Sequence, residues 1–381
     1  MKIKIEAKEL KIITEKVICN IEKSSLPILE CIKIESKGNI LYFSSTNMER
    51  FLTVRTDNYT PIIDGMICID NKDFSLLLKM KNEIELTEQE GVLIVKNRSK
   101  TLKMQVQDVK EFPSFPQEEV KNVLKMPESE LAEVLKNLYS WTIQSNNNPV
   151  FQCYNFNLQH NRTEALDGFR IAMKSFDADC IMDTDTKNFT LHNKAYDSLK
   201  KTIVEKEKSV ITFGINENYV CVAGKDFEFY SRKIVGEYVN VQNTLPSEHK
   251  HSFEVSAEEL KQISQYNTDL FKKSKSDKKY MLFYGSENSL QSYFKTEKFE
   301  TIDNINAEKL NIENELLISF NPKYMMEALK IADKEKVALE FSTALSPIII
   351  KADKYSFLVL PVRLSDNMDI IIEKLKREQA A

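Results

Sequence analysis

The chain has 381 residues, 42% of them hydrophobic and 29% charged, and carries a formal net charge of -4. A chain of this length exceeds the size that one hydrophobic core usually serves, so we expect two or three domains. We find neither a signal peptide nor an apolar run near the roughly 18 residues of a membrane span, and expect a cytoplasmic protein with no membrane partner. A net acidic chain does not hold nucleic acid through bulk positive charge, so any contact with DNA must be local.

The predicted elements begin with a strand that places Ile3 and Ile5 on one face. A helix follows near Leu10, with apolar residues at steps of three and four. The same strand and helix return twice at nearly constant spacing, with Leu131 and Leu260 in the place of Leu10. The chain therefore contains an internal repeat of domain length.

A second helix recurs in each copy, and it opens at Asn71, Asn193 and Asn321. Each of these helices precedes two short apolar strands, so every copy can bury its own core. We predict an α+β fold of three repeated domains, each with two helices packed on an antiparallel sheet. The predicted domains are residues 1–118, 119–248 and 249–364, followed by a C-terminal tail, 365–381, in which we expect a short amphipathic helix.

Most signatures of catalysis are missing from this sequence. The eight glycines form neither a dinucleotide-binding loop nor a P-loop, and the four histidines lack the spacing of metal ligands. The six cysteines form no C-x-x-C pair and are expected to be reduced. We expect no enzyme activity, no metal and no cofactor. An enzyme on an unrelated α+β repeat remains an alternative that would require a polar pocket.

The middle of the chain carries the segment LDGFRIA, residues 166–172. Taken alone, Asp167 and Gly168 predict only the tight turn of a hairpin. The segment nevertheless resembles the T-D-G-H-R-L-A motif of bacterial sliding clamps, the beta subunit of DNA polymerase III. Three further segments match that family in the same order: LPIL at 26–29, FPSFP at 112–116 and LVLPVRL at 358–364.

The resemblance implies a non-catalytic processivity factor for DNA replication. Chains of this family have three domains and pair head to tail as homodimers, which form a six-domain ring around duplex DNA without sequence specificity. The implied partners are the alpha subunit of the replicative polymerase, the delta subunit of the clamp loader and other proteins with a clamp-binding motif, at the nucleoid. The alternative is a phage, plasmid or regulatory paralogue that binds partner peptides without encircling DNA.

In this family a hydrophobic cleft between the middle and last domains binds partner peptides. The resemblance places the cleft at Phe151, Leu166, Gly168, Phe169, Arg170, Ile171, Pro246, Leu358, Leu360, Pro361, Val362 and Arg363. An apolar groove would bury the anchor side chains of a peptide, and the arginines would hold its polar groups. The alternative for 358–364 is an ordinary core strand, because alternate side chains must point inward.

Lysines recur on the helices of all three copies. On a single helix they indicate only a solvated face, but three equivalent domains could gather them on one surface that meets phosphates. The expected DNA contacts are Lys23, Lys79, Lys194, Lys200, Lys201 and Lys330. The family's dimer contact falls at Lys72, Met104, Leu270 and Phe271.

The sequence departs from the family in three ways. Phe169 stands where the family has His and Leu166 where it has Thr, so we expect a more apolar cleft. The chain also continues beyond the usual end through residues 365–381. Our hypothesis is that this tail packs beside the cleft and modulates access to it.

Overall fold

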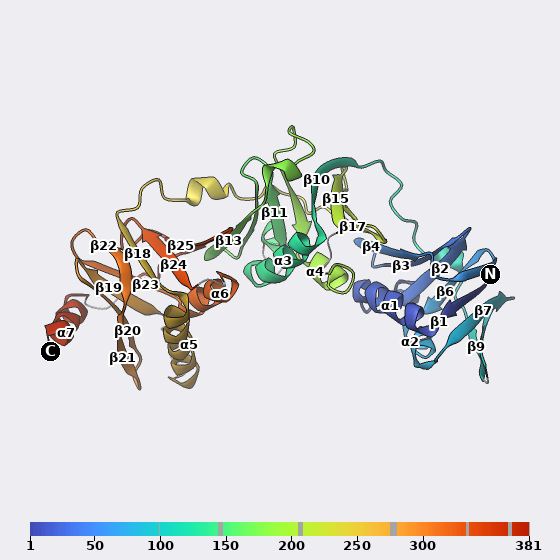
Figure 1. The fold of residues 1–381 in the computed structure, drawn as a ribbon, viewed down its shortest axis with the longest axis horizontal. Helices are drawn as coiled ribbons and strands as arrows, with labels where there is room; N and C mark the ends of the chain where they lie inside the picture. Colours follow the sequence, from blue (N-terminus) through green and yellow to red (C-terminus); the bar gives the residue numbers. More distant parts are fainter. Residues whose placement is uncertain are drawn as a thin grey trace. The chain divides into compact units, whose positions relative to one another are not determined.

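The computed structural model describes residues 1–98, 100–143, 148–204, 209–274, 280–332, 335–364 and 368–380. The chain forms two compact units. Unit 1 consists of Met1–Tyr139, Gln152–Asn161 and Asp177–Gly236, and unit 2 consists of Ser140–Phe151, Arg162–Phe176 and Glu237–Ala381. Each unit combines helices with antiparallel sheets, which confirms the predicted α+β class (Figure 1).

Unit 1 contains two complete sheets and one further strand pair. The first sheet has the order β5-β1-β7-β8-β9, with β1 Lys2–Glu6, β5 Thr60–Ile63, β7 Glu83–Gln89, β8 Val92–Asn97 and β9 Lys100–Gln105. The second has the order β10-β15-β16-β17-β4-β3-β2-β6, with β2 Cys31–Lys37, β3 Ile40–Thr46, β4 Arg50–Thr56, β6 Gly65–Asp70, β10 Lys121–Pro127, β15 Val210–Ile215, β16 Tyr219–Ala223 and β17 Phe227–Arg232. The pair consists of β11 Cys153–Asn157 and β14 Asn188–His192.

Unit 2 contains the remaining strands. Seven follow the order β12-β13-β26-β25-β24-β18-β22, with β12 Arg162–Leu166, β13 Arg170–Ser175, β18 His251–Ser256, β22 Ala307–Asn311, β24 Lys336–Phe341, β25 Ile348–Ala352 and β26 Tyr355–Val359. Four form the order β21-β20-β19-β23, with β19 Met281–Ser286, β20 Ser289–Lys295, β21 Glu300–Ile305 and β23 Leu316–Phe320.

The helices follow the predicted repeat. Those of unit 1 are α1 Ala7–Val17, α2 Asn71–Phe74, α3 Glu128–Leu138 and α4 Lys194–Leu199, and those of unit 2 are α5 Ala257–Ser274, α6 Pro322–Ala332 and α7 Met368–Ala380. The long helices α1, α3 and α5 each follow directly on a strand. The apolar residues of each helix recur on one face, and this face is buried. The second helices α2, α4 and α6 each precede a pair of antiparallel strands, as predicted. The three domain boundaries remain a prediction.

The C-terminal tail folds as predicted but lies elsewhere than expected. Helix α7 places Leu375 in a buried cluster with Leu282, Tyr284, Tyr293 and Leu317. These partners belong to β19, β20 and β23, so the tail covers the four-stranded sheet (Figure 1). The hypothesis that it packs beside the cleft is therefore wrong, because the apolar face of α7 finds its contact on this sheet.

Among the helices of the described residues, none combines the length and the apolar character that crossing a membrane requires.

Candidate binding cleft

The predicted turn at Asp167 and Gly168 joins β12 to β13. Gly168 has a φ of 91°, a backbone conformation that residues with a side chain rarely adopt. The Asp167 side chain accepts a hydrogen bond from the backbone N–H of Phe169 at 3.0 Å, which closes the turn locally. A second bond, from the backbone N–H of Leu360 to the carbonyl of Phe169 at 2.9 Å, ties this turn to the end of β26.

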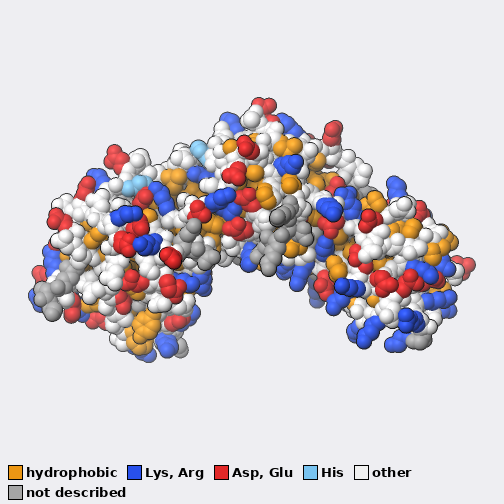
Figure 2. All heavy atoms as spheres, viewed as in Figure 1, with side chains coloured by type: hydrophobic (Ala, Val, Ile, Leu, Met, Phe, Trp, Pro, Cys, Tyr) orange, Lys and Arg blue, Asp and Glu red, His pale blue; other side chains and the backbone are white. Residues whose placement is uncertain are grey.

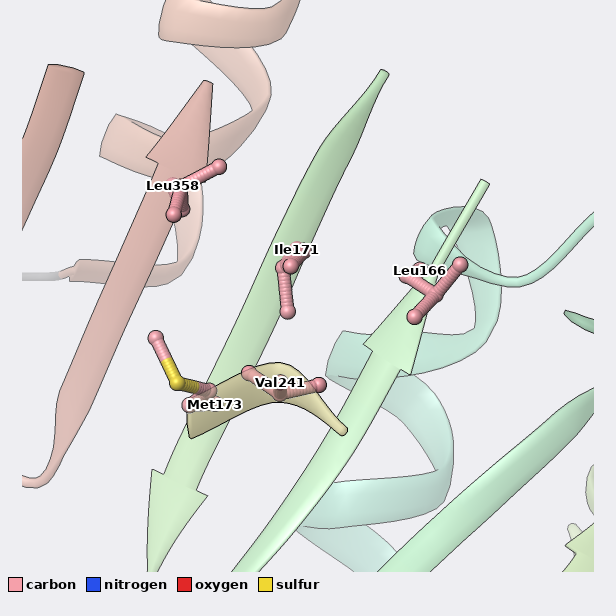
Figure 3. Close-up of a cluster of buried hydrophobic side chains, with 5 residues drawn as sticks. All are labelled: Leu166, Ile171, Met173, Val241 and Leu358. Atoms are coloured by element: carbon pink, nitrogen blue, oxygen red, sulfur yellow. The ribbon is translucent and has the colours of Figure 1, made fainter. Parts of the chain in front are cut away.

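Three apolar side chains form a row across neighbouring strands. Leu166 of β12 lies opposite Ile171 of β13, and Ile171 lies opposite Leu358 of β26. Together with Met173 and Val241 they form a buried cluster, which we call the cleft cluster (Figure 3). Val241 comes from the short 3-10 helix Val241–Thr244 that crosses over the strands. The register of the sheet therefore builds an apolar floor within unit 2.

The edge of this floor carries half-buried and exposed side chains. Phe151, Tyr238 and Leu245 pack against the cleft cluster and are only partly buried. Phe169 is 62% exposed and Leu360 is 40% exposed, although both are strongly apolar. Exposed apolar side chains above an apolar floor are typical of a surface that another molecule covers.

The remaining residues of the predicted cleft lie near this edge, and Arg363 is the charged one among them. Arg363 is exposed, and the described part of the chain offers its guanidinium no partner. Pro361, Val362 and Pro246 are half-buried, and Gly168 is exposed. The backbone N–H of Val362 donates to the carbonyl of Ser319 at 2.9 Å, which fixes the path of this segment. Arg363 is thus the predicted cleft arginine that is free to meet a ligand.

Arg170 lies behind the cleft, because successive side chains of a strand point to opposite faces. Its side chain is only 5% exposed, and its guanidinium lies over the ring of Trp141 at 4.4 Å and of Tyr324 at 4.5 Å. It donates to Asp167 Oδ2 at 2.8 Å, to the carbonyl of Ser140 at 2.7 Å and to Glu327 Oε2. The structure therefore gives Arg170 a positioning role beneath the turn.

Sequence reasoning missed several residues of this site. Met173, Tyr238 and Val241 belong to the cleft cluster or pack against it, and Trp141 with Tyr324 encloses Arg170. Alternation along β13 would have predicted Met173, since it lies two residues after Ile171. The others come from distant segments, which no local pattern connects to residues 166–172.

Three of the expected DNA-contact lysines lie on α4 or directly after it, and Lys23 lies in the same unit. The hydroxyl of Ser198 donates to Asn20 Oδ1 at 2.8 Å, which joins α4 to the segment that leads to Lys23. Lys194 and Lys200 both reach Asp197, at 3.3 and 3.4 Å, whereas Lys201 and Lys23 are exposed. Lys194, Lys200 and Lys201 therefore gather at α4, and the bond from Ser198 to Asn20 ties the segment before Lys23 to this helix. We call these four lysines the basic surface of unit 1. Lys79 is exposed after α2, and Lys330 is exposed on α6 in unit 2.

His192 lies beside this basic surface, at the end of β14. Its Nδ1 accepts a hydrogen bond from the backbone N–H of Lys194 at 3.0 Å, and its Nε2 lies 3.2 Å from Gln152 Oε1. Burial lowers the pKa of His192 to about 4, and the nearby Arg50 cation adds to this effect. The imidazole is therefore neutral near pH 7. Within the described ranges, no three His, Cys, Asp or Glu side chains are grouped as metal ligands would be.

The expected dimer residues occupy two different environments. Lys72 is exposed and forms an ion pair with Glu30 at 3.0 Å, and Met104 is half-buried on β9. Leu270 and Phe271 of α5 are buried within unit 2, where Phe271 packs edge to face on Phe294 at 4.7 Å. Strand β9 ends one sheet of unit 1 and β21 ends one sheet of unit 2, so each leaves an open edge.

The chain is similar in sequence to known sliding clamps. The family described as DNA polymerase III beta subunit, C-terminal domain, matches residues 242–363. The beta sliding clamp of Halalkalibacterium halodurans is 26% identical over 357 residues, which are 90% of this chain and 93% of that relative. The beta sliding clamp of Bacillus subtilis is 25% identical over 361 residues, with the same shares.

Solved structures show the same fold. The DNA polymerase sliding clamp from Bacillus subtilis superimposes with a TM-score of 0.87 at 21% identity, over 96% of this chain and 99% of that one. The Helicobacter pylori beta clamp, solved bound to a DNA ligase peptide, superimposes with a TM-score of 0.81 at 20% identity, over 95% of this chain and 100% of that one.

Proposed function

We propose, from the premise that this chain belongs to the bacterial beta sliding clamp family, that it encircles duplex DNA as a head-to-tail dimer and docks replication proteins at the cleft cluster. Its role is that of a processivity factor in DNA replication, at the nucleoid in the cytoplasm. It performs no catalysis itself, because a ring that holds a polymerase on DNA acts through its topology.

The observation that carries the peptide-docking role is the row Leu166, Ile171 and Leu358 beneath the exposed side chains of Phe169 and Leu360. A peptide with two or three apolar anchors would cover these side chains and gain the free energy of burying them. The exposed Arg363 can pair with a carboxylate of the peptide. The polymerase alpha subunit, the clamp-loader delta subunit and repair proteins are the expected sources of such peptides.

Head-to-tail closure is supported by the charges of the two open edges. Strand β9 carries Lys100 and Lys103 and no acidic residue, whereas β21 carries Glu300 and Asp303 and no basic residue. Figure 2 shows several Lys and Arg side chains along the rim of unit 1 where β9 lies. An edge strand exposes unpaired backbone groups that a second chain can satisfy. Pairing of unlike edges makes a heterologous contact, which closes into a ring when the rotation permits.

Contact with DNA is assigned to the basic surface of unit 1. Two of its lysines share Asp197, so their charge is partly compensated, while Lys23 and Lys201 remain exposed. Contacts of this kind bind phosphate weakly and without reading bases, which lets a ring slide.

The peptide-docking role is tested by fluorescence anisotropy with a labelled copy of the ligase peptide that the Helicobacter pylori relative binds. We expect saturable binding, and we expect Phe169→Ala to weaken it about tenfold, because its ring loses the contact that the peptide would bury. The matched control is Ile63→Ala, an exposed apolar residue of unit 1, which contributes nothing to the cleft cluster. Equal binding by wild type and Phe169→Ala would contradict the assignment of this surface.

A further inference from the structure

Helix α7 covers an apolar face that would otherwise meet solvent. Its Leu375 is fully buried among side chains of β19, β20 and β23, and Ile371 and Ile372 pack against the same cluster. Ile302 of the edge strand β21 also packs there. The helix therefore lies across the sheet and reaches its open edge.

Ion pairs fix which flank of α7 faces that edge. Lys374 lies 2.7 Å from Glu300, the first residue of β21, and Lys376 pairs with Glu315 next to β23. The hydroxyl of Tyr293 donates to Glu300 at 2.6 Å, and the pair with Lys374, followed by this bond, lowers the pKa of Glu300. One flank of α7 thus faces the open edge and the other faces the opposite side of the sheet.

Ile370 belongs to the flank that faces the open edge. It precedes Lys374 by four residues, and residues four apart on a helix lie one above the other on one face. Its side chain is 65% exposed, while the other isoleucines of this helix are partly buried. An exposed isoleucine beside an unpaired strand leaves apolar surface where a partner strand would lie.

We propose that the flank of α7 at Ile370 and the open edge β21 form one docking surface for β9 of a second copy of this chain. The inference rests on the head-to-tail dimer proposed above and adds to it an element beyond the usual end of the family. Lys374 already pairs with Glu300, so Asp303 is the acidic residue of β21 that meets the basic strand β9 of the second copy, whose backbone also pairs with the open edge.

The two faces of the sheet agree with this occupant. Asn267 of α5 accepts a hydrogen bond from Thr301 at 3.1 Å, whereas the next residue, Ile302, packs in the cluster of α7. Because successive side chains of a strand point to opposite faces, α5 and α7 lie on opposite faces of β21. Met104 of β9 points to the face opposite Lys103, and Lys103 lies across from Ile94 of β8. If Met104 of the second copy lies on the α5 side, its Ile94 and Lys103 lie on the α7 side, where Ile370 offers an apolar contact.

The test is the dimer dissociation constant, measured by analytical ultracentrifugation of the full chain. We expect Ile370→Glu to weaken dimerisation at least about tenfold, because a charge replaces an apolar contact. The control is Ile12→Glu, the same substitution at an exposed position of α1, which should dimerise as the wild type does. Amide exchange in α7 and β21 should also slow as the wild-type protein dimerises.

The outcomes separate the two proposals. A wild-type dimer that Ile370→Glu does not weaken, or that Ile12→Glu weakens equally, overturns the role of α7 and leaves the ring standing. Exchange in α7 that is unchanged on dimerisation also overturns that role. A wild type that stays monomeric at every concentration overturns the ring and the role of α7 together.

Discussion

Replacement of Arg170 by alanine tests whether the turn beneath the cleft depends on a buried cation. The guanidinium is almost fully buried, donates to Asp167, Glu327 and the carbonyl of Ser140, and lies between two aromatic rings. Removal of the guanidinium leaves the largely buried carboxylates of Asp167 and Glu327 without this cation, and only Lys323, 3.8 Å from Glu327, still lies near one of them. We expect the variant to fold with a lower stability of unit 2 and a loosened turn at Phe169.

The size of this loss follows from the geometry. Breaking a buried ion pair by removing one partner costs about 3 to 5 kcal/mol, because the remaining charge stays poorly solvated. The side chains of Asp167 and Glu327 are 16% and 19% exposed, so water reaches them only in part. The lost stacking on two rings adds to the destabilisation. Arg170→Lys keeps one charge but loses the planar fork, so an intermediate loss is expected.

The assay uses the single tryptophan of the chain. Trp141 is fully buried, and the Arg170 guanidinium lies 4.4 Å from its ring centre, so its fluorescence reports unfolding at this site. Urea titration at neutral pH should move the transition of Arg170→Ala to markedly lower urea. The control is Lys336→Ala, which removes an exposed ion pair with Glu308 in the same unit and should change little.

A titration of Arg170→Ala that coincides with the wild type would refute this reasoning. Such a result would mean that water solvates the two carboxylates at no cost, and that the guanidinium does not hold the turn. An equal loss in Arg170→Lys and Arg170→Ala would instead show that the fork geometry, and not the charge, stabilises the turn.

Three further predictions follow from the site. Burial and the Arg50 cation lower the pKa of His192 to about 4, whereas the pKa in the unfolded chain is about 6.5. The free energy of unfolding should therefore decrease as the pH falls from about 6.5 to 4, because the unfolded chain binds the proton first. His192→Gln should flatten this slope of unfolding free energy against pH. Leu360→Ala should weaken peptide binding several-fold in anisotropy titrations without shifting the urea transition, because this side chain is 40% exposed. Lys200→Glu with Lys201→Glu should shorten retention on DNA and reduce its salt dependence, which gel-shift titrations at several salt concentrations measure.

The repeated pattern of strand, helix and strand pair was predictable because it depends on local periodicity. The strand that holds Ile3, the helix that holds Leu10 and their later counterparts all form where apolar spacing placed them. The turn at Gly168 was equally visible, since few residues accept its backbone conformation.

The contacts behind the turn were not predictable in the same way. Trp141 and Tyr324 lie far from Arg170 in sequence, and only the folded sheet brings them to its guanidinium. The position of α7 could not be predicted from the sequence for a related reason. Its apolar face predicts that it packs somewhere, but the choice of the sheet around Tyr284 depends on the shape and exposure of that surface.

The sequence also did not show which of the two arginine side chains is exposed to a ligand. Arg170 and Arg363 both stand in segments that resemble the family's cleft, yet Arg170 is buried and Arg363 is exposed. Alternation along β13 decides the first case, because Ile171 takes the cleft face. Resemblance assigns a residue to a site, and the direction of its side chain decides what it can do there.

The decisive measurement is whether the protein is held on DNA by topology. The chain is loaded on a nicked circular plasmid and passed through a gel-filtration column at a salt concentration high enough to disrupt electrostatic contacts between protein and phosphate. We expect a species with twice the chain mass of 44.2 kDa to stay with the circle and to leave as soon as a restriction enzyme linearises it. Loss from the intact circle at the same rate as from linear DNA would contradict the ring.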